Sequence, residues 1–157
     1  MASPSAVHQG ISMELSIQFG SWLRGKPCQV FAAPLDVRLF PKKDKSDNTV
    51  VQPDLLVVCD KDKLSKNSVD GAPDLVVEIP PPLDSCHEWF LKFEYYMKAG
   101  VREYWVIAPE EKKAQVHIYK DGHYISTAYE DNDHIPVTVL PGLDIALEDL
   151  WARIPGE

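Results

Sequence analysis

Apolar residues recur at helical spacing in two separate segments of the chain. Residues 10–23 place apolar side chains every three or four positions, and Gly25 and Pro27 follow as stop signals. A second helix is predicted to end at Ala99 before Gly100, with Asp84 or Ser85 as its N-cap. The apolar side of this second helix is expected to consist of Phe90, Phe93, Tyr96 and Met97.

Between and after these helices, the pattern indicates buried strands. Residues 30–40 are predicted to form one strand that ends at the charged loop 42–48. Residues 50–59 and 74–79 are apolar on both faces, as in strands covered from both sides, and Pro80 to Pro82 stop the latter strand. Another buried strand is expected at 103–107.

The carboxy-terminal part alternates between apolar and polar residues, as expected for a meander. Segments 115–119 and 123–128 flank Asp121-Gly122, a strong signal for a two-residue hairpin turn. A last strand is expected at 135–140 and a short helix at 147–153. Together the elements predict one α/β (α+β) domain over residues 1–157, with a central mixed sheet flanked by helices and a C-terminal β-meander.

The amino-acid composition excludes some classes of function. The 157 residues include 16 Lys and Arg against 24 Asp and Glu, a net charge of −8 that excludes a broadly basic nucleic-acid binder. An enzyme that gathers carboxylates around a divalent cation is not excluded. No apolar run is long enough to cross a bilayer, so no membrane partner is expected.

The cysteines and the amino end bear on location. Cys28, Cys59 and Cys86 are odd in number and widely spaced, so neither a disulfide framework nor a zinc site is expected. Residues 1–5 lack the pattern of a signal peptide. We therefore predict a protein of the reducing cytoplasm.

Two acidic residues stand out because of where they lie. Glu78 is inside a segment that reads as buried on both faces, and Asp54 opens the preceding buried strand. A divalent cation held by both would relieve their repulsion; the alternatives are a basic partner for Glu78 and a structural role for Asp54 at a strand start. Lys92 on the following helix is a candidate basic partner, although it could instead pair with Glu88 at i, i+4.

Several blocks of the chain, taken in order, resemble one family. They resemble the Uma2-type (DUF820) restriction-endonuclease family of the PD-(D/E)XK nuclease superfamily. The matching blocks are SAVHQ (5–9), PLDVRL (34–39), PDLLVV (53–58), GAPDLVVEI (71–79), KFEYY (92–96) and AGVREYWV (99–106).

The resemblance implies a Mg²⁺-dependent phosphodiesterase site, with Mn²⁺ as a substitute ion. Asp54 and Glu78, 24 positions apart, would be the metal ligands, and a lysine would orient the attacking water. Where the superfamily has that lysine, this chain has Pro80. The resemblance implies that the lysine lies instead on the following helix, where Lys92 matches the family's motif.

Three further acidic residues are secondary candidates, each with a structural role as the alternative. Asp36 and Asp74 match acidic positions of the family, and Asp74 could instead cap the entrance of its strand. Glu14 on the first helix could face the site.

The function expected from this resemblance is an Mg²⁺-dependent endonuclease that acts on nucleic acid, with DNA as the expected substrate. A homodimer is expected because cutting both strands of a duplex favours two sites, and the meander offers an edge strand for pairing. The alternative is a catalytically inactive nuclease-fold protein that serves as an oligomeric binding or scaffold module. The acidic charge, the displaced lysine and the short amino-terminal segment favour that alternative.

Overall fold

The computed structural model describes residues 4–81 and 86–156, with no side chains described for 86–89. The helices in this part are α1 (Ala6–Leu23), α2 (Cys86–Ala99) and α3 (Leu147–Trp151), with short 3-10 turns at Lys61–Lys63 and Pro109–Glu111. Ser5 caps α1, since its hydroxyl oxygen accepts a hydrogen bond from the His8 N–H. The proposed cap of α2, Asp84 or Ser85, lies outside the described residues.

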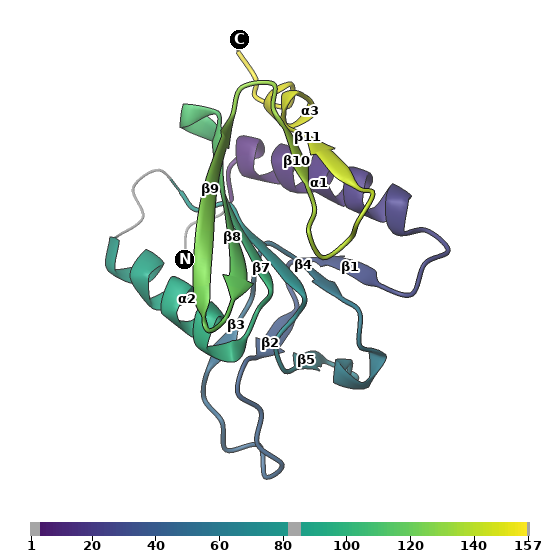
Figure 1. The fold of residues 1–157 in the computed structure, drawn as a ribbon, viewed down its shortest axis with the longest axis vertical. Coiled ribbons are helices and arrows are strands. Elements are labelled where there is room, and N and C mark those ends of the chain that lie inside the picture. The colour runs from purple at the N-terminus through teal and green to yellow at the C-terminus, as the bar shows by residue number, and fades with distance from the viewer. Residues whose placement is uncertain (1–3, 82–85, 157) are drawn as a thin grey trace.

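A six-stranded mixed sheet organises the molecule (Figure 1). Its strands, in spatial order, are β1 (Gln29–Ala32), β4 (Leu55–Val58), β6 (Leu75–Glu78), β7 (Glu103–Ala108), β8 (Lys113–Lys120) and β9 (His123–Glu130). β6 and β7 run parallel and α2 connects them, whereas the other neighbours are antiparallel. The predicted mixed sheet with flanking helices and the Asp121-Gly122 hairpin are both confirmed, and both turn residues have positive φ.

Two small sheets complete the structure. One contains β3 (Val50–Val51), β2 (Asp36–Arg38) and β5 (Ser68–Asp70), and the other contains β10 (His134–Pro136) and β11 (Asp144–Ala146). The predicted strand 135–140 is therefore shorter, and it pairs with β11 rather than extending the meander.

The two faces of the main sheet carry separate hydrophobic cores. Leu55, Val57 and Val77 pack with α1, α3 and β11 on one face. Leu56, Val58 and Val76 face the other core, which includes Tyr96 of α2. Both β4 and β6 are buried along their whole length, as predicted from their apolar pattern.

Prolines divide two of the predicted strands. Residues 30–40 form β1 and β2, which belong to different sheets and flank Pro34, and residues 50–59 form β3 and β4, which flank Pro53. Proline has no N–H to donate to a sheet ladder, so each strand stops there. Phe90, expected on the apolar side of its helix, is 62% exposed.

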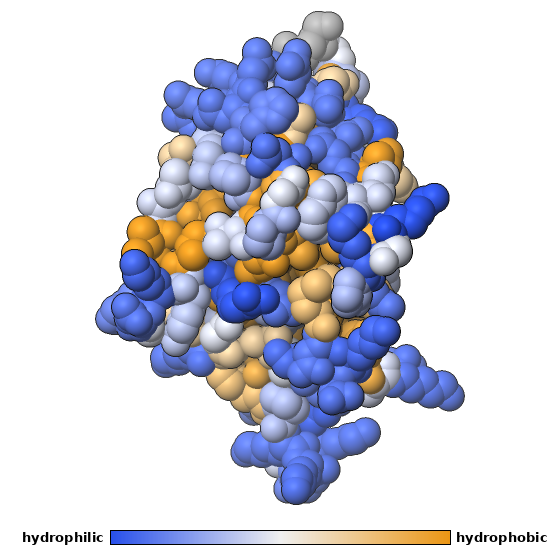
Figure 2. Space-filling model, turned by 45° about the vertical axis from the view of Figure 1, so that its right-hand side comes forward, coloured by the Kyte–Doolittle hydropathy of each residue, from blue (hydrophilic) through white to orange (hydrophobic). Residues whose placement is uncertain are grey.

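The surface mixes polar ends with a more apolar middle. Figure 2 shows hydrophilic residues at the two ends of this face and hydrophobic residues between them. On α1, Met13 and Ile17 remain exposed by 55% and 45%. None of the helices in the described parts is both long enough and apolar enough to span a membrane.

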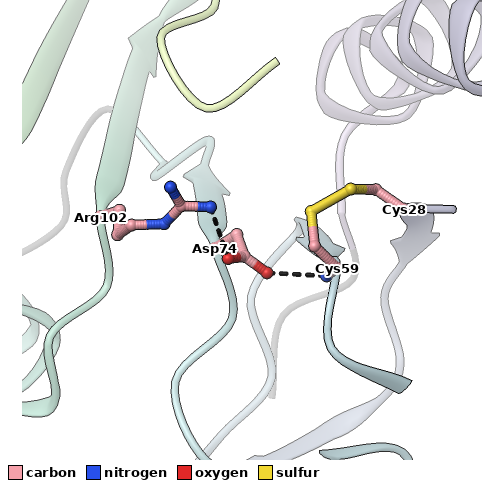
Figure 3. Close-up of a disulfide and its surroundings, with 4 residues drawn as sticks. All are labelled: Cys28, Cys59, Asp74 and Arg102. Carbon is pink, nitrogen blue, oxygen red and sulfur yellow. Dashed lines mark hydrogen bonds and ion pairs between the residues drawn. A yellow bond between two sulfur atoms is a disulfide. The ribbon is translucent and has the colours of Figure 1, made fainter.

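One prediction about the cysteines is wrong, because Cys28 and Cys59 form a disulfide (Figure 3). They come just before β1 and just after β4, and the register of this antiparallel pair places them opposite each other. Strand pairing brings the two cysteines together, and their spacing along the chain does not predict this pairing. Beside the disulfide, the Cys59 N–H donates to Asp74, and Arg102 pairs with the same carboxylate.

The disulfide closes a loop across a sequence separation of 31 residues and should therefore stabilise the fold. Reduction is expected to lower the free energy of unfolding by about 2–4 kcal/mol, because the reduced unfolded chain has more conformations. Thermal unfolding with and without dithiothreitol measures this. A Cys28→Ala/Cys59→Ala variant should lose the response to reductant and Cys86→Ser should retain it; equal stability of the oxidised and reduced wild type would contradict the expectation.

Candidate functional site

Asp54 and Glu78 face each other at one end of two central strands. β4 and β6 are antiparallel, with Leu55 opposite Val77. One residue further along the same register, Asp54 lies opposite Glu78. The convergence of the two carboxylates expected from the sequence is therefore present, and the strand pairing produces it.

Glu78 is a buried carboxylate with two compensating partners. The residue is only 5% exposed. Its Oε2 atom accepts a hydrogen bond from the Tyr96 hydroxyl at 2.8 Å and lies 3.3 Å from Lys92 Nζ. Burial raises the pKa of Glu78; the charge of Lys92 opposes this shift, while the charge of nearby Asp54 adds to it.

Asp54 is held by the backbone and by a histidine. Its Oδ2 atom accepts a hydrogen bond from the Ile79 N–H at 2.6 Å, which ties it to the residue after Glu78. Its Oδ1 atom lies 3.0 Å from Nε2 of His8, in the first turn of α1. The hydrogen bond to Asp54 raises the pKa of His8, against the effect of partial burial.

Lys92 lies where the sequence suggested, near the end of the strand that carries Glu78. Lys92 and Tyr96 are four residues apart on α2 and so share one helix face, which is why both reach the same carboxylate oxygen. The alternative pairing of Lys92 with Glu88 concerns a side chain outside the described residues.

The secondary candidates have other partners. Asp36 accepts a hydrogen bond from Gln52 at 2.7 Å. Asp74 precedes β6, at the opposite end of the strand from Glu78, and contacts Arg102 and the Cys59 N–H. Glu14 on α1 contacts Gln18 and Arg153.

Sequence reasoning missed His8 and Tyr96. His8 is 46 positions from Asp54, and no ligand spacing along the chain links it to the site. Tyr96 looked like a core aromatic residue, and it is fully buried. Its i, i+4 relation to Lys92 is the one signal that could have found it.

The donor chemistry of this site fits a hard divalent cation. Two carboxylates from adjacent strands supply oxygen ligands, and Mg²⁺ is typically bound through one or two carboxylates, with waters and phosphates completing its shell. Among the described side chains, those of residues 4–81 and 90–156, no group of three or more His, Cys, Asp or Glu is arranged to hold a metal ion. Asp54 and Glu78 are two oxygen donors of the type that such a cation binds.

Comparison with known proteins supports this interpretation of the fold. The Uma2 family model, described as "Putative restriction endonuclease", matches residues 1–148. A solved structure described as a putative nuclease belonging to DUF820, from Anabaena variabilis ATCC 29413, is 19% identical. The alignment covers 97% of this chain and 84% of that chain, with a TM-score of 0.76, which shows a shared fold. A comparison with curated proteins gives no significant match.

Removing the Tyr96 hydroxyl tests the electrostatics of this site. Its hydrogen bond favours ionised Glu78, so Tyr96→Phe should raise the pKa of Glu78 further above its ordinary value. A metal ion requires the ionised carboxylate, so metal-dependent thermal stabilisation should begin at a higher pH in this variant. The half-exposed neighbour Tyr95 provides the control, Tyr95→Phe. Identical pH profiles for Tyr96→Phe and wild type would contradict the assignment.

Proposed function

Because the chain belongs to the Uma2 family, whose model spans residues 1–148, we propose that it is a divalent-metal-dependent endonuclease that hydrolyses phosphodiester bonds. The observation that carries the proposal is the cross-strand pair Asp54 and Glu78, with Lys92 3.3 Å from Glu78. In this proposal Asp54 and Glu78 bind Mg²⁺, with Mn²⁺ as a substitute.

The side chains divide the work by chemistry and position. Asp54 and Glu78 bind the cation through carboxylate oxygens, and the Ile79 N–H orients Asp54. When bound, a divalent cation polarises a phosphoryl oxygen and lowers the pKa of a coordinated water. Lys92 keeps its ammonium group at the site, where it can orient the attacking water or stabilise charge that develops on the phosphate.

Lys92 is well suited to this second role because it is both anchored and accessible. Its side chain is 42% exposed, so it can meet a phosphate arriving from solvent while its ammonium group stays beside Glu78. A long flexible stem lets a lysine on a helix replace one missing from a strand. Pro80, two residues after Glu78 and beyond the end of β6, stands where the superfamily has lysine, so this proposal assigns the role to Lys92 of α2.

DNA is the proposed substrate. The net charge of −8 argues against strong general affinity for a polyanion. A bound cation changes the sign of the local field at the two carboxylates, so substrate binding should depend on the metal as well as on lysine contacts.

Asp54→Asn is the sharpest test. The amide oxygen can still accept the hydrogen bond from the Ile79 N–H, so the fold should persist, while a charged metal ligand is lost. Metal-dependent cleavage of plasmid DNA should fall by at least about a hundredfold. Asp121→Asn, in the turn between β8 and β9, is the control and should cleave normally. Full cleavage by Asp54→Asn would contradict the proposal.

Metal binding separates this function from an inactive scaffold. Mg²⁺ or Mn²⁺ at about 100 times its dissociation constant should stabilise the wild type by about 2.7 kcal/mol, and Asp54→Asn and Glu78→Ala should lose this effect. A wild type that neither melts higher with either ion nor cleaves nucleic acid would favour the scaffold function.

A homodimer forms part of this proposal because two sites are needed to cut both strands of a duplex. β9 is eight residues long and occupies one edge of the main sheet. No described strand pairs with its outer side, so the edge is available to a second copy.

Ile125 of β9, which is 55% exposed, allows a test of this edge. Ile125→Lys should convert a dimeric chain to a monomer, because a charged residue on an edge strand opposes strand pairing. Light scattering coupled to size exclusion measures the mass. His123→Lys, at the start of the strand, is a milder control. A monomeric wild type would contradict the homodimer and leave the nuclease proposal standing.

A further inference from the structure

His8 is placed at the candidate metal site by the start of α1. The Ser5 hydroxyl oxygen accepts from the backbone N–H of His8, and the Gln9 N–H donates to the Ser5 carbonyl oxygen, so this first turn is fixed at its cap. The His8 side chain is 21% exposed and that of Asp54 is 19% exposed. The imidazole is therefore held beside Asp54 while an ion from solvent can still reach it.

The distance between His8 and Asp54 matches the distance between two neighbouring ligand atoms of one metal ion. Nε2 of His8 and Oδ1 of Asp54 are 3.0 Å apart. That separation suits a hydrogen bond, and it also equals the roughly 3.0 Å between neighbouring ligands of an octahedral ion with bonds of about 2.1 Å. With bonds of about 2.1 Å, an ion bound to both atoms would lie about 1.5 Å off the line that joins them, so the imidazole ring would turn to direct its lone pair at the ion.

The other ring nitrogen leaves the tautomer open. Nδ1 of His8 is buried and has no hydrogen-bond partner among the described residues. The hydrogen bond to Asp54 favours a proton on Nε2, so a metal bound there would displace that proton, and the remaining ring proton would occupy Nδ1. A neutral imidazole in that tautomer is a common metal ligand.

We propose that His8 is a direct ligand of the divalent ion, through Nε2 and next to Asp54 Oδ1. This inference rests on the proposed function, because it concerns the ion assigned above to Asp54 and Glu78. The Oε2 atom of Glu78 contacts Tyr96 and Lys92, and Glu78 is not grouped with His8 and Asp54 as a ready metal site in the structure. His8 and Asp54 are therefore the two ligands that already lie at the required separation.

A nitrogen ligand has a consequence for ion selectivity. Mn²⁺ is the weakest imidazole binder among the divalent first-row transition ions, yet it accepts this nitrogen ligand more readily than Mg²⁺, which prefers oxygen. The site should therefore hold Mn²⁺ more tightly than Mg²⁺, by a margin that depends on His8.

The experiment uses the untagged full chain loaded with Mn²⁺ alone. Pulsed electron paramagnetic resonance should detect nitrogen coupled to the Mn²⁺ in wild type and in His123→Gln, which replaces an exposed histidine on β9, but not in His8→Gln. Titration of both ions should show that His8→Gln lowers the ratio of Mn²⁺ to Mg²⁺ affinity by roughly tenfold. Glutamine keeps an N–H for Asp54, so a residue that only positions Asp54 would leave the ratio unchanged.

The outcomes separate this inference from the proposed function. Mn²⁺ binding that requires Asp54 but shows no nitrogen coupling, with an unchanged affinity ratio in His8→Gln, would overturn the His8 ligand and leave the carboxylate site intact. No Mn²⁺ binding by folded wild type, checked by circular dichroism, would overturn both. Nitrogen coupling lost only in His8→Gln establishes the ligand.

Discussion

The buried carboxylate of Glu78 is the constraint on which the arrangement of the site depends. An uncompensated charge at this depth would cost several kcal/mol, so the fold must bring partners to it. Lys92 and Tyr96 meet this need from one face of α2. Because Glu78 needs both partners, α2 must turn the face that carries them toward the end of β6 as it connects β6 to the parallel strand β7. The same contacts leave the Lys92 side chain 42% exposed.

Three parts of the chain meet at this point because of how the sheet is built. The register of β4 and β6 places Asp54 opposite Glu78, and the Ile79 N–H holds Asp54 in position. α1 packs on the other face of the sheet from α2, and its first turn brings His8 to the end of β4. The site therefore lies where both layers meet the end of the central strands.

Two of the acidic residues of the chain lie together at the candidate site, where solubility does not explain them. Most of the 24 acidic residues can be explained by solubility, but Asp54 and Glu78 adjoin each other at low exposure, where repulsion helps raise the pKa of Glu78. Asp74, at the far end of β6, has Arg102 and a backbone N–H instead. Asp74 has its partners at that far end, whereas Asp54 and Glu78 lie close enough for their charges to repel each other.

Local periodicity in the sequence was sufficient to predict the helices, the buried strands β4, β6 and β7, the hairpin at Asp121-Gly122 and the unusual burial of Glu78. These features depend on neighbours within a few residues. The disulfide between Cys28 and Cys59 and the contact of His8 with Asp54 join residues 31 and 46 positions apart. Strand register and helix packing determine which distant residues come into contact, and spacing along the chain does not predict these contacts. The sequence thus determined which carboxylates needed partners and offered Lys92 for Glu78, whereas the tertiary structure alone decided that Tyr96 and His8 join them, because strand register and helix packing bring these residues to the site.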